Sequence, residues 1–146
     1  MIRNQRGVTL IELMVVVAII TLISAFAYPS YTRYVINSKR TAATSALLQI
    51  ADRQQQFFMD NKTYTNDLTV LGFAANPLVI SDDGNASAAA DTNSVYSISL
   101  ANVGVTTYTV TAAPLHAQLQ RDTKCASLII DQTGTKTAST GDDDCW

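Results

Sequence analysis

The chain has 146 residues, of which 47% are hydrophobic and 15% are charged, and its formal net charge at pH 7 is −2. This length suits one domain, or one domain with an appendage. Residues 1–62 hold seven lysines and arginines against three acids, whereas residues 63–146 hold three against nine. The acidic second half argues against a broad nucleic-acid-binding surface there, but it leaves room for a local basic patch.

The first seven residues, MIRNQRG, are polar, and a long apolar stretch, Val8–Tyr28, follows them at once. As a helix this stretch would be about 31 Å long, close to the thickness of the hydrocarbon core of a bilayer. Tyrosines at its end and just beyond it are typical of a membrane interface; they are Tyr28, Tyr31 and Tyr34. No A-x-A motif follows, so we expect the stretch to stay on the mature chain as a single membrane-spanning helix.

Glu12 is the one charged residue between Val8 and Tyr28 and the one glutamate in the chain. A lone carboxylate in hydrocarbon costs several kcal/mol unless it reaches the headgroups or finds a partner. Near a helix start, the helix dipole and the headgroups could stabilise it. Alternatively, a cut after Gly7 would create an amine at Val8, four residues away. If that amine paired with Glu12 of a neighbouring chain, the ion pair would set the register between the two chains during assembly.

Residues 29–60 predict an amphipathic helix that continues past Pro29 and ends near Asp60 and Asn61. Its stripe recurs at intervals of three, four or seven residues and comprises Val35, Ala42, Ala46, Ile50, Gln54 and Phe57. We expect this stripe to pack on the protein's own domain. The opposite side of the helix carries Lys39, Arg40, Asp52 and Arg53.

Residues 61–146 predict a globular domain that opens with a connecting region, residues 61–94, rich in turn signals. Alternating residues then predict antiparallel strands at Val95–Ala101, Thr107–Ala112 and Cys125–Asp131, and the turn QTGTK leads into a short fourth strand. Three or four strands with one apolar face would cover the amphipathic helix. The expected fold class is therefore α+β.

Cys125 and Cys145 are the two cysteines, and an even count in an exported domain predicts a disulfide, with two free thiols as the alternative. An oxidised domain outside the cell places the N-terminus inside. His116 is the one histidine, and no nucleotide-binding fingerprint occurs, so we expect no enzymatic activity and no cofactor. The run at Asp142–Cys145 is expected to be a solvated acidic loop rather than a calcium site, so no metal is expected.

The stretches RGVTLIELMVVVAII and AYPSY resemble the N-terminus of type IV pilins and of related proteins with class III signals. Residues 31–72 look like the helix and loop of PilE-like minor pilins, as do YTVTAAP, CASLIIDQTGTK and the terminal CW. The resemblance covers nearly the whole chain. It implies a type IV pilin fold, in which a long N-terminal helix, transmembrane in its first half, packs on a three- to four-stranded antiparallel sheet with a C-terminal disulfide loop.

This resemblance also implies roles for individual residues. A prepilin peptidase would cut between Gly7 and Val8 and methylate the new amine of Val8. Glu12 would guide subunits into the growing fibre, and Pro29 is a helix breaker near which the helix can open locally. The expected segments are a leader peptide, residues 1–7; a transmembrane and assembly segment, 8–28; an amphipathic helix, 29–60; and the globular pilin domain, 61–146.

The implied function is that of a structural, minor subunit of a type IV pilus, which serves adhesion, twitching motility or DNA uptake. Its partners would be other pilins, through their N-terminal helices, the prepilin peptidase, the inner-membrane assembly machinery and, before assembly, lipid. It would sit in the bacterial inner membrane with a cytoplasmic N-terminus and later in an extracellular fibre.

Three alternatives stay open: a DNA- or surface-binding minor pilin, a pseudopilin of a type II secretion system, and a membrane anchor that never assembles. Without its leader the chain would have eight lysines and arginines against twelve acids, a charge of −4. That charge disfavours DNA as a partner but leaves a basic patch near Arg121 and Lys124 open.

Overall fold

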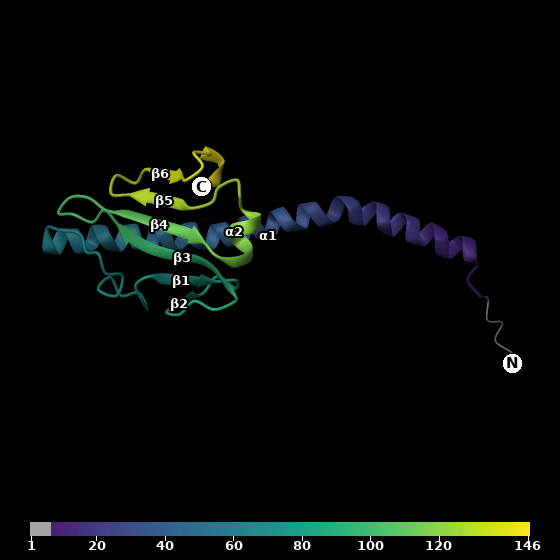
Figure 1. Cartoon of the computed structure of the whole chain (residues 1–146), viewed down its shortest axis with the longest axis horizontal. Coiled ribbons are helices and arrows are strands. Elements are labelled where there is room, and N and C mark those ends of the chain that lie inside the picture. Colours follow the sequence, from purple (N-terminus) through teal and green to yellow (C-terminus); the bar gives the residue numbers. More distant parts are fainter. Residues whose placement is uncertain (1–6) are drawn as a thin grey trace. The chain divides into compact units, whose positions relative to one another are not determined.

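The computed structural model describes residues 7–146, apart from the side chain of Asp143. The chain divides into two compact units, Met1–Val35 and Ile36–Trp146, and each is considered by itself. One helix, α1 (Leu10–Asn61), gives its first half to the first unit and its second half to the second unit (Figure 1). Of the leader peptide predicted for residues 1–7, only Gly7 lies within the described part of the chain.

The first unit consists of the apolar half of α1. Within residues 7–146, α1 is the one helix long and apolar enough to cross a membrane, with a window of mean hydropathy 2.6. Pro29 lies inside the helix and cannot donate a backbone hydrogen bond, so the carbonyl of Ala25 loses its usual partner. On both sides of Pro29, side-chain hydroxyls donate to helix carbonyls. Thr21 donates to the carbonyls of Val17 and Ala18, and Ser30 donates to that of Phe26.

The second unit contains a six-stranded, fully antiparallel sheet in the order β2-β1-β3-β4-β5-β6. The strands are β1 (Leu78–Ser81), β2 (Ala86–Ser87), β3 (Ser94–Ala101), β4 (Thr109–Pro114), β5 (Leu128–Asp131) and β6 (Lys136–Ala138). A short helix, α2 (His116–Arg121), follows β4, and a 3-10 turn, η1 (Asp143–Cys145), ends the chain. Strands β3 to β6 are neighbours in sequence order, whereas β1 lies between β2 and β3, so β2 and β6 form the edges.

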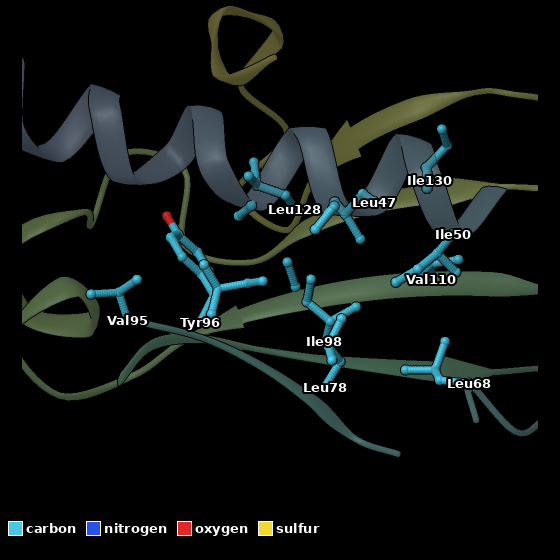
Figure 2. Close-up of a cluster of buried hydrophobic side chains, with 14 of the residues drawn as sticks. Leu47, Ile50, Leu68, Leu78, Val95, Tyr96, Ile98, Val110, Leu128 and Ile130 are labelled. Carbon is cyan, nitrogen blue, oxygen red and sulfur yellow. The ribbon is translucent and has the colours of Figure 1, made fainter. Parts of the chain in front are cut away.

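The core of this unit lies between α1 and one face of the sheet (Figure 2). On α1 the buried residues recur at helical spacing and are Ala43, Ala46, Leu47, Ile50 and Gln54. They meet inward-facing strand residues, which are Leu78, Ile80, Tyr96, Ile98, Val110, Ala112, Leu128 and Ile130. Each fully buried Leu or Ile side chain contributes about 1.5–3 kcal/mol relative to exposure.

Gln54 is the polar member of the buried stripe on α1, and both ends of its side-chain amide are hydrogen-bonded. Its Nε2 donates to the carbonyl of Thr65 over 2.6 Å, and its Oε1 accepts from the amide of Thr65 over 3.2 Å. A buried amide is tolerated only when both ends are bonded. Gln54 therefore fixes the start of the connecting region to the helix.

The predicted α+β fold is confirmed, and the sheet is larger than expected. The strands predicted from alternation correspond to β3, β4 and β5, and the turn at Gly134 leads into the expected short fourth strand, β6. The two additional strands, β1 and β2, lie in the region expected to connect helix and sheet. With four and two residues, they are too short to show an alternating pattern, and β2 lies in a run of small residues. Helix α2 was likewise missed, because six residues carry little periodicity.

Of the residues expected on the side of α1 opposite the buried stripe, Arg40 turns toward the domain, so the prediction was wrong for it, whereas Arg53 is exposed as expected. The Arg40 side chain is only 13% exposed and binds Asp122. Arg53 donates from Nη1 to the carbonyl of Leu71 over 2.8 Å. Both side chains are long enough to lie along the helix and carry their charge to the domain.

Candidate functional site

The residues expected at the processing site stand at the start of α1. Gly7 and Val8 are exposed and precede the helix, and a side chain added at Gly7 would meet no atom within 4 Å. Thr9 accepts a hydrogen bond from the backbone amide of Glu12 over 3.3 Å, as an N-cap residue does. Glu12 is exposed in the first turn. A peptidase could therefore approach the Gly7–Val8 bond, and the Glu12 carboxylate faces outward from the helix.

The apolar half of α1 has no cover of its own. Its large side chains between Val8 and Phe26 are 46–76% exposed; they are Val8, Leu10, Ile11, Leu13, Met14, Val15, Val16, Val17, Ile19, Ile20, Leu22, Ile23 and Phe26. A continuous apolar surface of this extent marks a membrane or protein contact. Either lipid or other chains must cover it.

Cys125 and Cys145 form a disulfide, with Cα atoms 5.6 Å apart. It closes the loop that carries β5, β6 and η1. Lys124, beside Cys125, lies 3.4 Å from Asp142 and 3.3 Å from Asp144. Two acids of the C-terminal run are thus paired with a cation, and no metal-binding group of three or more side chains occurs among the described side chains, which leave out that of Asp143.

A buried polar cluster joins α1, β3 and α2, and the sequence analysis missed it. Arg40 donates to Asp122 through Nη2 at 2.6 Å and Nε at 3.1 Å. The Tyr96 hydroxyl also donates to Asp122, over 3.1 Å, and Gln118 Nε2 donates to the Tyr96 hydroxyl over 3.1 Å. Burial raises the pKa of Tyr96 to about 12, even though the Gln118 hydrogen bond opposes the rise. No sequence motif marks these residues, because 82 positions separate Arg40 from Asp122.

A pocket of about 240 Å³ opens beside this cluster. Lys39 of α1, together with His116 and Arg121 at the two ends of α2, lies in its wall. Lys39 binds Asp82 over 2.6 Å. The pocket beside Arg121 is therefore lined by Lys39 and not by Lys124, and each of these two lysines is paired with an acid.

These groups do not form a catalytic constellation. His116, whose imidazole is of the general acid and base type, lines the pocket, and the lysine and the carboxylate beside it, Lys39 and Asp82, are paired with each other. Both cysteines are oxidised. The described residues provide an apolar helix that the chain itself does not cover, with a single glutamate near its start. They also provide a disulfide-bonded domain with one basic pocket.

Family comparisons match both units. Residues 29–129 match the family described as type IV minor pilin ComP, DNA uptake sequence receptor. Residues 2–28 match the prokaryotic N-terminal methylation motif. The two matches meet at Pro29, and the first covers more than half of the chain.

Individual relatives are pilins and fimbrial proteins. The type IV major pilin protein PilA of Myxococcus xanthus is 39% identical over 49% of this chain and 32% of its own. The fimbrial protein EcpC of Eikenella corrodens is 32% identical over 69% of this chain and 66% of its own. The chain thus spans a third to two thirds of the length of these relatives.

Among solved structures, a type IV pilin from Shewanella oneidensis aligns with 76% of this chain and 97% of its own, at a TM-score of 0.49 and 19% identity. The family assignment depends on the two sequence matches. Since the larger of them spans residues 29–129 and the other supplies the N-terminal motif, the chain belongs to the type IV pilin family, as a member of the group described as type IV minor pilin ComP, DNA uptake sequence receptor.

Proposed function

We propose that this chain is a minor subunit of a type IV pilus, cut by a prepilin peptidase between Gly7 and Val8 and methylated at Val8. The observation that carries the proposal is the uncovered apolar half of α1 with the lone Glu12 in its first turn. The match to the methylation motif over residues 2–28 supports processing, and the match to a minor-pilin family supports the minor role.

Before assembly the segment 8–28 spans the inner membrane, with the N-terminus in the cytoplasm and the domain outside. Assembly then moves this segment from lipid into contact with the same segment of other pilins. The transfer gains little hydrophobic free energy, because lipid is as apolar as the segment. Close packing and pairing of Glu12 with the amine of Val8 in a neighbour therefore set the register.

Pro29 has a second part in this proposal. The helix lacks one backbone hydrogen bond there. The hydroxyls of Thr21 and Ser30 also donate to helix carbonyls, which gives these carbonyls a partner other than the backbone amide. Opening the helix near Pro29 costs less than elsewhere in α1. Subunits use this local opening to fit the fibre.

The test compares Glu12→Ala with Thr9→Ala in cells that make pili. Intact mass and N-terminal sequencing should show both variants cut and methylated at Val8. Because only Glu12→Ala removes the charge, we expect it to fall at least about tenfold in sheared fibres, the effect of about 1.4 kcal/mol. Thr9→Ala removes only the helix cap, so its level should stay within about twofold of the parent chain.

Two results would contradict the proposal. A chain that still begins at Met1 and never reaches fibres would be a plain membrane anchor. Equal losses in Thr9→Ala and Glu12→Ala would mean that Glu12 acts through the helix start rather than by pairing between subunits.

Reception of DNA is the second candidate function, and the match of residues 29–129 to a DNA uptake sequence receptor favours it. The charge of the domain opposes it. Duplex DNA is bound chiefly through cations that neutralise phosphates, and acids outnumber cations in this chain. A DNA-binding role would therefore depend on the few cations that the domain leaves available.

A further inference from the structure

Most cations of the second unit are already engaged with the protein. Arg40 is held by Asp122, and Lys124 lies between Asp142 and Asp144. Arg53 binds the Leu71 carbonyl, and Lys62 binds the Met59 carbonyl. Each of these side chains therefore already has a partner within the domain.

Lys136 is also engaged, because its Nζ lies 5.4 Å from the centre of the Trp146 ring. Arg121 differs from all of these. Among the side chains that the structure describes, none forms a hydrogen bond or ion pair with its guanidinium, and the residue is exposed at the end of α2. An arginine with five unused donors is well suited to a phosphate.

The pocket beside α2 brings Arg121 together with two further basic side chains, Lys39 and His116. Separate elements build it: α1 supplies Lys39, α2 supplies His116 and Arg121, and the start of β3 with the turn before it supplies Ser94 and Asn93. Its volume of about 240 Å³ is that of about eight waters, at about 30 Å³ each. A phosphodiester group with part of its hydration shell fits this volume.

His116 has a left-handed backbone, with φ of 45°, at the first position of α2. Such a conformation is uncommon for a residue with a side chain and persists only where its surroundings hold it. Here the amides of Gln118 and Leu119 both donate to the Leu115 carbonyl, which fixes the turn that carries His116. The backbone that carries His116 at the pocket wall is thus fixed by this turn.

We infer that the pocket formed by Lys39, His116 and Arg121 binds a backbone phosphate of duplex DNA. The inference rests on the second candidate function above. It assigns the DNA contact to one pocket in a domain that has few cations available for phosphate. All three residues fall within 29–129, the range that matches the receptor family. Asp82 reduces the positive charge by pairing with Lys39, so binding is weak and strongly dependent on salt.

The test measures binding of a fluorescent 24-base-pair duplex to the full chain in non-ionic detergent, at about 50 to 200 mM salt. Arg121→Gln is compared with Lys136→Gln, which removes the same charge from β6, outside the pocket. We expect Arg121→Gln to weaken binding about five- to tenfold at low salt and to reduce the salt slope by about 0.9. Lys136→Gln should change the dissociation constant less than about twofold.

Asp82→Asn provides a change of opposite sign. It releases Lys39 from its partner, so binding should tighten about three- to fivefold, provided Lys39 contacts phosphate. Inorganic phosphate, added at constant ionic strength, should displace the duplex only at millimolar concentration. Displacement by micromolar phosphate would show a site for the free anion and overturn the DNA assignment.

Equal weakening by Arg121→Gln and Lys136→Gln would overturn the pocket while leaving DNA reception intact. No binding by the parent chain at low salt would overturn both. Neither result bears on the pilus subunit, because Arg121→Gln should still enter sheared fibres at the parental level. Fibre assembly thereby also confirms that the variant is folded.

Discussion

Asp122 is the most consequential single acid of the second unit. Its side chain is 1% exposed, and it accepts hydrogen bonds from Arg40, Tyr96 and Gln118. A buried carboxylate is tolerated only with such full pairing. The backbone carbonyl of Asp122 also accepts a hydrogen bond from the amide of Ala126. Asp122 therefore connects α1 to the start of the disulfide loop.

We predict that Asp122→Ala lowers the free energy of unfolding by about 3–5 kcal/mol, because it leaves Arg40 charged and partly buried. The matched control is Asp82→Ala, which removes the acid partner of the neighbouring cation, Lys39. Asp82 is 58% exposed, so its loss should cost less than about 1 kcal/mol. Chemical denaturation of the full chain in detergent measures both. Similar costs would mean that the buried cluster adds no stability beyond a surface pair.

Tyr96 makes the same cluster sensitive to alkaline pH. Burial raises the pKa of its hydroxyl from 10.0 to about 12, so the folded state holds this proton more strongly than the unfolded state. The folded state therefore binds more protons between these values, and the free energy of unfolding falls as pH rises through this range. The loss is up to about 3 kcal/mol and is absent below pH 10.

The measurement is absorbance of ionised tyrosine in the parent chain and in Tyr96→Phe. The chain has six tyrosines. Subtracting the variant's titration should isolate one group that ionises near pH 12, together with unfolding. A difference curve centred near 10 would show that the hydroxyl is solvated and contradict the buried arrangement.

At the scale of elements, the disulfide loop is the part of the domain most dependent on a covalent bond. The loop spans 20 positions and holds three short elements, β5, β6 and η1. Its end is also secured by Trp146, whose Nε1 donates to the Thr137 carbonyl over 2.8 Å at the edge strand. This bond occupies a carbonyl that an exposed edge would otherwise offer to another chain.

We predict that replacing both Cys125 and Cys145 with serine lowers the free energy of unfolding by about 3 kcal/mol. Trp146 is the single tryptophan, so its fluorescence should shift to the red as the loop loosens. Reduction of the parent chain is the matched control and should reproduce both effects. An unchanged spectrum and a cost below about 0.5 kcal/mol would mean that Trp146 and Lys124 hold the loop without the disulfide.

Long helix α1 combines two different faces in one element. In the second unit its buried positions follow helical spacing, and the sheet covers them. In the first unit the apolar residues surround the helix, so no face is left polar. The physical reason is that the first half must be covered by lipid or other pilins, and these approach from every side.

At the scale of the whole molecule, charge separates the two proposed activities. The first unit carries one acid, Glu12, in an apolar surface where a single charge has a large effect. The second unit is acidic, and its cations are mostly paired internally. Assembly and DNA contact therefore depend on different residues, and variants can separate them.

Much of this organisation could be predicted from the sequence. The apolar stretch after Gly7, the lone Glu12 and the amphipathic continuation of the helix are local patterns, since neighbouring residues create them. Alternation likewise predicted β3, β4 and β5. The pairing of Cys125 with Cys145 followed from there being only two cysteines. Cleavage and methylation at Val8 and the assembly roles of Glu12 and Pro29 stay predictions.

Tertiary structure alone decided the rest. The strands β1 and β2 exist because they pair with β3 and with each other, not because their few residues favour extended structure. Arg40 turns inward because Asp122, 82 positions away, is brought beside it. The pocket of Lys39, His116 and Arg121 arises in the same way, from α1 and α2 meeting in the folded domain. Contacts between distant residues leave no periodic signal in a single sequence, so only the packed chain reveals them.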